Sequence, residues 1–196
     1  MPKHVDPDQR RGELAEAAAQ VIARKGIDGA SLRSVAAEAG WTTGALVHYF
    51  ANKRELLIFT LQTSLERRRS RHADRSSMTP FEALRASLHD GLPVTEESTL
   101  HWVVTLAFAA QSSADPELAT VQRDAYRNFR DRVGRLVVAS RSGDTVDIDP
   151  VEEAERLIAL LDGIAIQAIF DPASWPAERQ ERALDAGLVT DHPVPT

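Results

Sequence analysis

The chain has 196 residues, 43% hydrophobic and 27% charged, which suits one large globular domain or a small domain joined to a larger one. It contains no cysteine, which excludes disulfide bonds and thiolate metal sites. The polar N-terminus lacks the apolar core of a signal peptide, and no apolar stretch approaches the ~20 residues that span a bilayer, so we expect a cytoplasmic protein.

The charge is unevenly distributed along the chain, whose net charge is −6. Residues 1–75 contain 13 Lys and Arg against 9 Asp and Glu, whereas the remaining residues contain 10 against 20. The first segment therefore carries +4 and the rest −10. Phosphate binding requires a local basic face rather than a basic protein, so the acidic total leaves nucleic-acid binding open for the first segment.

Helical periodicity predicts four helices in the first part of the chain, over residues 8–25, 31–39, 42–50 and 53–71. Each is preceded or opened by a residue that commonly caps a helix N-terminus, namely Asp8, Ser31, either Thr42 or Thr43, and Asn52. Gly26 and Gly40 follow the first two helices, where glycine often ends a helix.

The rest of the chain is predicted to add helices over residues 80–92, 100–110, 115–139, 151–170 and 176–187. The second and fourth of these are apolar on most sides, which is typical of helices that are buried or line a cavity. We find no strand pattern and no internal repeat. The predicted fold class is therefore all-α, with about nine helices.

Residues 31–50, SLRSVAAEAGWTTGALVHYF, have the pattern of a helix-turn-helix. Gly40 permits a sharp turn, and small residues at Ala36 and Ala39 let the two helices cross closely. The second helix would then present its N-terminal side to the major groove of DNA. From spacing alone, an ordinary helical hairpin in which Tyr49 and Phe50 are core residues explains the segment equally well.

A wider stretch resembles a known family. Residues 26–31 (GIDGAS), 35–41 (VAAEAGW), 44–50 (GALVHYF) and 53–57 (KRELL) are similar to successive parts of the N-terminal signature of the TetR family of bacterial repressors. Val47 departs from the pattern, since many members carry Tyr there. The resemblance implies that Phe50 anchors the recognition helix, that Tyr49 and Lys53 bind phosphates and that the side chains near bases are Thr42, Thr43 and His48.

From the residue types and this resemblance together, we predict a DNA-binding set of Ser31, Arg33, Thr42, Thr43, Gly44, His48, Tyr49 and Lys53. The predicted domains are a three-helix helix-turn-helix DNA-binding domain over residues 1–52 and a helical ligand-binding and dimerisation domain over residues 53–196, with residues 53–72 as a connecting helix. The expected partners are a palindromic double-stranded DNA operator, a second copy of the chain and a small-molecule effector.

The C-terminal part resembles the subgroup that includes choline-responsive betaine regulators, through residues 157–172, LIALLDGIAIQAIFDP. In the family this helix and the last one pair with their copies across a two-fold axis and form a four-helix bundle. The predicted dimer interface accordingly comprises Ala159, Leu160, Gly163, Ile164, Gln167 and Ala168. A helix buried within one monomer remains the alternative.

An effector pocket is predicted among the helices of the second domain. Its candidate lining residues are Phe81, His89, Trp102, Phe108, Gln111, Tyr126 and Phe129, each of which is also suited to plain core packing. The sequence has no phosphate-binding loop and no metalloprotease motif, so we predict no catalytic site, no metal and no cofactor. An activator, or an interaction protein without ligand control, remains the alternative to a repressor.

Overall fold

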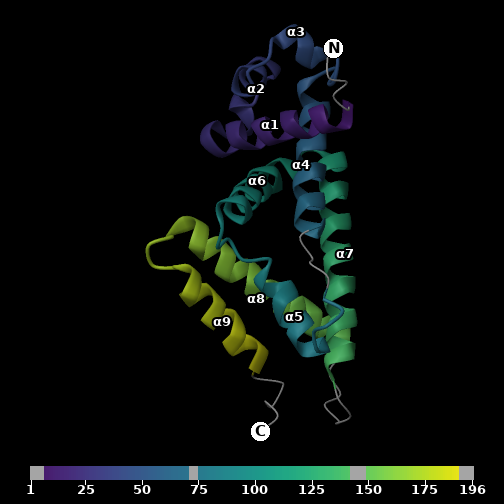
Figure 1. Ribbon diagram of the computed structural model, residues 1–196, viewed down its shortest axis with the longest axis vertical. Helices are drawn as coiled ribbons and strands as arrows, with labels where there is room; N and C mark the ends of the chain where they lie inside the picture. Colours follow the sequence, from purple (N-terminus) through teal and green to yellow (C-terminus); the bar gives the residue numbers. More distant parts are fainter. Residues whose placement is uncertain (1–6, 71–74, 142–148, 190–196) are drawn as a thin grey trace. The chain divides into compact units, whose positions relative to one another are not determined.

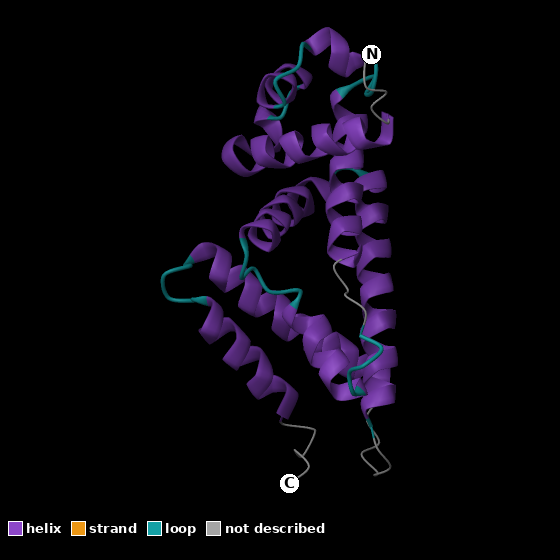
Figure 2. Ribbon diagram, in the orientation of Figure 1, coloured by secondary structure: helices purple, strands orange, loops and turns teal. Residues whose placement is uncertain are grey.

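The fold was obtained as a computed structural model, which describes residues 7–70, 75–141 and 149–189. Within these ranges the chain is helical and contains no strand (Figures 1 and 2). The helices are α1 (Pro7–Gly29), α2 (Leu32–Glu38), α3 (Thr43–Val47), α4 (Lys53–Ser70), α5 (Pro80–His89), α6 (Glu96–Ser112), α7 (Pro116–Ser140), α8 (Pro150–Phe170) and α9 (Ala177–Val189). The predicted all-α class is confirmed.

The described residues form two compact units, and each is considered by itself. The first comprises the residues up to Arg67 together with Val103–Gln122, and the second comprises Arg68–Trp102 together with the residues from Arg123 onward. By packing, α4 therefore groups mainly with α1 to α3. The functional boundary after residue 52 stays a prediction, and the last residues of the predicted connecting helix, 71 and 72, lie outside the described ranges.

The first unit is built on α1, against which α2 packs (Figure 1). The inward face of α1 carries Leu14, Val21 and Ile22, which are fully or almost fully buried. Gly26 interrupts the helix with a φ of 68°, in the left-handed region that glycine adopts without steric penalty. The predicted stop at Gly26 is thus a break in direction, after which one further helical turn reaches Gly29.

The second unit has its own apolar core, formed by one face each of α5, α7, α8 and α9. Its buried side chains include Leu84, Leu88, Phe129, Val133, Val137, Leu157, Leu161, Ile164, Leu184 and Leu188. Helices α8 and α9 approach closely, because Gly187 leaves space where the side chain of Leu160 lies. The Arg156 guanidinium also donates to the Gly187 carbonyl at 3.0 Å.

Several predicted helix ends differ from the structure, and α3 ends at Val47 rather than Phe50. Helix α6 begins at Glu96 rather than near Leu100, because Thr95 and Ser98 exchange side-chain and backbone hydrogen bonds that cap its first turn. Helix α5 ends at His89 rather than Leu92. In the described ranges, none of the helices has the length and apolar character needed to cross a bilayer.

Candidate DNA interface

The turn between α2 and α3 is held by local hydrogen bonds. At the start of α2, Ser31 and Ser34 form a capping box, in which each side chain accepts from the other's backbone N–H. At its end, Gly40 adopts a φ of 71°, and the Trp41 N–H donates to the Ala36 carbonyl at 2.8 Å. The sharp turn predicted at Gly40 is therefore confirmed.

Helix α3 is short, and its inward side fixes its orientation. The Thr42 hydroxyl caps the helix by accepting from the Ala45 N–H at 3.2 Å. Leu46 and Phe50 are both 0% exposed. The ring of Phe50 lies 5.4 Å from that of Phe59 on α4, which anchors the end of the α3 segment to the next helix.

The outward side of α3 is open. Thr42, Thr43, Gly44 and His48, all predicted to face DNA, are exposed. Among the described residues, nothing outside α3 itself lies within 4 Å of the position a Gly44 Cβ would occupy. Ser31 and Arg33 are exposed at the start of α2. Val47 is 48% exposed on the same stretch and is absent from the predicted set. The sequence singles out Val47 only as a departure from the family signature, and its apolar side chain did not indicate a DNA contact.

Two aromatic residues brace the edge of this surface. Tyr49 is half-buried, and its ring meets the Trp41 ring edge-on at 5.6 Å. The Arg10 guanidinium of α1 lies 5.4 Å from the centre of the Trp41 ring, a cation–π arrangement. Neither Arg10 nor Trp41 was in the predicted set, although both place polar or aromatic groups beside the turn.

Lys53 has a structural role that the sequence did not indicate. Its ammonium donates to the carbonyls of Ile27 at 2.7 Å and Asp28 at 3.2 Å. These carbonyls lie at the end of α1, so Lys53 joins that end to the start of α4. An ammonium has three donors, so these two bonds leave one N–H for a further acceptor.

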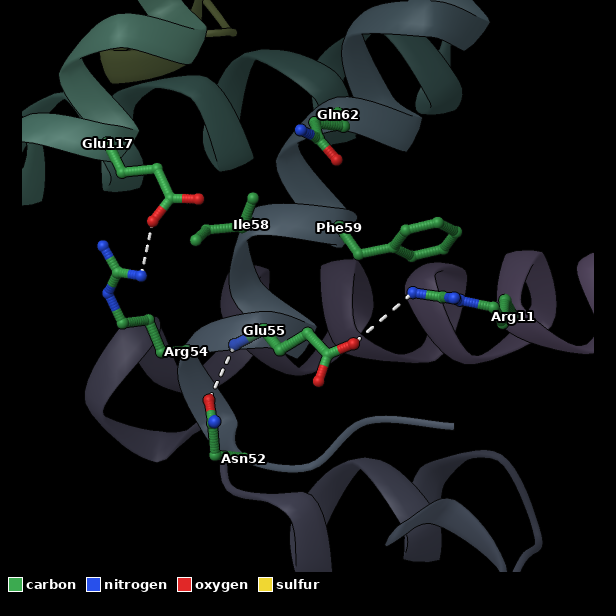
Figure 3. Close-up of a pocket in the computed structure, with 8 residues that line it drawn as sticks. All are labelled: Arg11, Asn52, Arg54, Glu55, Ile58, Phe59, Gln62 and Glu117. Carbon is green, nitrogen blue, oxygen red and sulfur yellow. Dashed lines mark hydrogen bonds and ion pairs between the residues drawn. The ribbon is translucent and has the colours of Figure 1, made fainter. Parts of the chain in front are cut away.

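A cavity of about 350 Å³ lies beside the start of α4 (Figure 3). Arg11 of α1 reaches Glu55 across it at 3.7 Å, and Arg54 points the other way, to the start of α7. Arg54 binds both carboxylate oxygens of Asp115, at 2.9 and 3.1 Å, and also binds Glu117. The hydrogen bond from Arg54 lowers the pKa of Asp115 below its usual value. The lining charges are thus already paired within the chain.

Two parts of the chain match models of known protein families. A family model described as bacterial regulatory proteins of the tetR family matches residues 14–58, and one described as the C-terminal part of BetI-type transcriptional repressors matches residues 80–190. The chain belongs to the TetR family. It is therefore a DNA-binding transcriptional regulator and not an enzyme, and TetR regulators bind operator DNA as dimers.

Relatives and solved structures of the TetR type extend over nearly the whole chain. The transcriptional regulator PksA of Bacillus subtilis is 34% identical over 187 residues, covering 94% of this chain and 90% of its own. A transcriptional regulator from Rhodococcus sp. Rha1 superposes with a TM-score of 0.82 at 30% identity, covering 98% of this chain and 100% of its own. One from Saccharomonospora viridis, solved in complex with choline, has the same fold, with a TM-score of 0.84 at 22% identity and coverages of 94% and 97%.

The predicted effector-pocket residues are not all brought together within one unit. Phe108 and Gln111 belong to the first unit, whereas Phe81, His89, Trp102, Tyr126 and Phe129 belong to the second. Trp102, Phe108 and Phe129 are buried, but Gln111 and Tyr126 are exposed. Among the polar contacts, the indole N–H of Trp102 donates to the Gly91 carbonyl at 2.7 Å, and the Tyr126 hydroxyl donates to Asp162 at 3.0 Å.

The predicted dimer-interface residues divide between two sides of α8. Ala159, Gly163 and Gln167 are exposed at helical spacing, and Leu160 is half-buried. Ile164 and Ala168 are 3% and 4% exposed, because the helical period turns them toward the core of their own unit. They therefore have little surface to offer to a TetR-type partner. Phe170, at the end of α8, is 76% exposed and was not predicted.

Proposed function

We propose that this TetR-family regulator is a repressor that holds a palindromic operator as a homodimer and releases it when a small molecule binds. The observation that carries the proposal is the open outer side of α3, held in place by the buried Leu46 and Phe50. A reading helix must be presented rigidly to enter the major groove in one register. Because its ligand is chromosomal DNA, we place the protein in the cytoplasm, at the nucleoid.

The DNA contacts divide by chemistry. Thr43, Gly44 and His48 lie on the open side of α3 and are proposed to meet base edges, with Thr42 at the helix start. Phosphates would be bound by the side chains at the flanks, namely Ser31, Arg33, Tyr49 and the remaining N–H of Lys53. The division proposed for function, residues 1–52 for DNA and residues 53–196 for dimerisation and ligand, assigns α4 as the connecting helix.

We propose α8 as the centre of the dimer interface. Ala159, Gly163 and Gln167 form one exposed row, and among the described residues nothing outside the neighbouring turns of α8 lies within 4 Å of the position a Gly163 Cβ would occupy. A glycine within a helix costs stability, and here no neighbour in the same chain requires it. Close approach of a second α8 would account for Gly163 and would also cover the exposed ring of Phe170.

Organic cations are the effector class we propose first. The Saccharomonospora viridis regulator was solved with choline, and a relative from Paenarthrobacter nicotinovorans, 29% identical over 173 residues, is a nicotine-responsive repressor. Choline is a quaternary ammonium ion and nicotine carries a basic tertiary amine, so both are organic cations. In the second unit, the pair formed by Tyr126 and Asp162 offers an aromatic ring and a carboxylate, the groups that recognise such cations.

Selection of bound DNA from a random pool tests the DNA proposal, and a palindrome is the expected result. Arg33→Ala and Tyr49→Phe should then each weaken binding to all selected sequences by a similar factor, because phosphate contacts carry no sequence information. Arg33→Ala should also reduce the salt dependence, because it removes a cation. Tyr49→Phe retains the ring against Trp41, so it removes only the hydroxyl. A pool from which no sequence is enriched would overturn the proposal.

A further inference from the structure

Val47 is the one large apolar side chain on the open side of α3. It is 48% exposed, while its neighbour Leu46, which is turned toward the core, is 0% exposed. Val47 follows Thr43 and Gly44 by one helical turn, so the three residues share a face. Packing in the core of the unit therefore does not account for an apolar residue at position 47. A contact with DNA does, because Val47 lies on the face of α3 that carries Thr43 and Gly44, here called the reading face.

The chemistry around Val47 restricts what it can recognise. Residues 39–52 contain no Lys, Arg, Asp or Glu, so α3 has none of the charged side chains that commonly read guanine or cytosine. In the major groove, the apolar group that base pairs display is the 5-methyl group of thymine. Gly44 has no side chain, and the space where its Cβ would lie is open, which permits close approach of the backbone to the groove.

We infer that Val47 is a specificity-determining residue that packs against a thymine methyl group in each operator half-site. The inference deepens the proposed DNA contacts and rests on α3 being the reading helix. It predicts that the selected half-site contains a thymine opposite Val47 that tolerates replacement poorly. Its neighbours Thr43 and His48 would set the adjoining base pairs through hydrogen bonds.

Uracil substitution tests this, because deoxyuridine differs from thymidine only by the methyl group. In the selected operator, each thymine of one half-site is replaced in turn by uracil, and the dissociation constant is measured by fluorescence anisotropy at fixed salt. For the wild type, we expect uracil at one position to weaken binding about fourfold, from the transfer free energy of one methyl-sized group. Replacement in both half-sites should weaken it about 15-fold.

The Val47→Ala variant completes the experiment. The variant should bind with the same dissociation constant whether that position carries thymine or uracil. Uracil at other positions should affect it as it affects the wild type. Val138→Ala, which truncates a valine of 56% exposure on α7, is the matched control and should discriminate as the wild type does. Alanine is a better helix former than valine, so we expect α3 to form in the variant.

The outcomes separate the possible failures. If the wild type shows no thymine-to-uracil effect, or if Val47→Ala retains the same effect at every position, the methyl contact is refuted. If Val47→Ala loses affinity for all operators without a change in discrimination, Val47 acts on the fold of α3 and not on specificity. If the random pool yields no enriched sequence for the wild type, the DNA proposal itself has failed.

Discussion

Replacing either of two glycines of the helix-turn-helix by alanine adds the same methyl group, but we expect the two substitutions to change the stability of the protein in opposite directions. Gly40 and Gly44 each have open space where a Cβ would stand, so neither Gly40→Ala nor Gly44→Ala creates a clash. They differ in backbone conformation: Gly40 has a φ of 71°, whereas Gly44 lies within α3. Steric overlap therefore does not contribute to either substitution. The backbone conformation at each position alone decides whether the free energy of unfolding rises or falls.

The magnitudes follow from that difference. An L-residue in the left-handed region costs about 1–2 kcal/mol, so Gly40→Ala should lower the free energy of unfolding by this amount. Alanine in place of glycine within a helix gains about 0.5–1 kcal/mol, so Gly44→Ala should raise it. The two variants should therefore differ by about 1.5–3 kcal/mol.

Urea unfolding followed by circular dichroism, at one fixed protein concentration because a dimer's stability depends on it, measures this difference. Operator binding should show the reverse order. Gly44→Ala places a methyl group on the reading face and should bind DNA more weakly despite its higher stability. Gly40→Ala, measured while folded, should bind nearly as the wild type does. Equal unfolding midpoints for the two variants would refute the reasoning.

Two further predictions concern the second unit. Gly163→Glu should produce monomers that bind the operator weakly, whereas Gly163→Ala should remain dimeric on size-exclusion chromatography; a dimeric Gly163→Glu contradicts the assignment of α8. Burial of Asp185 opposes its ionisation, but hydrogen bonds from Arg85 and His89 outweigh this and lower its pKa. A lowered carboxylate pKa contributes stability that is present above the unfolded value of about 3.9 and is lost as the pH falls through the folded value. The difference in unfolding free energy between the wild type and Asp185→Asn should therefore narrow between about pH 5 and pH 3, and a difference that stays constant would show that Asp185 does not contribute in this way.

Local chemistry made most helix boundaries predictable. Ser31, Thr42 and Pro80 occupy the capping and first-turn positions expected of them. These positions are predictable because a capping side chain bonds to the backbone only two or three residues further along the chain. The start of α6 was predicted late because its first turn, beginning at Glu96, is polar and carries no apolar periodicity. The signal that would have located it is the Thr95–Ser98 capping pair.

The phase of an apolar helix was harder to predict. Helix α8 is apolar on more than one side, so small and aliphatic residues alone did not distinguish the face toward the core from the exposed face. Ile164 and Ala168 were consequently grouped with Ala159 and Gly163, although only the latter two are exposed. The hydrogen bonds of Lys53 could not be predicted either, because its carbonyl partners lie 25 and 26 residues earlier in the chain.

Helix α7 contributes residues to both units. Its first residues, up to Gln122, belong to the first unit, and its later residues contribute Phe129 and Val133 to the core of the second. Asp115 caps α7 through the N–H groups of Glu117 and Leu118, and it also binds Arg54.

Arg54 lies in the first turn of α4, four residues after Phe50, the anchor of the recognition segment. A shift of α7 would therefore change the contact between Asp115 and Arg54 at the start of α4. An effector can produce such a shift only to the extent that it binds the two arrangements with different affinities. Since the pair is exposed, its own contribution to stability is small. Arg54 therefore contacts the start of α7 through a pair that is too weak to fix the position of that helix.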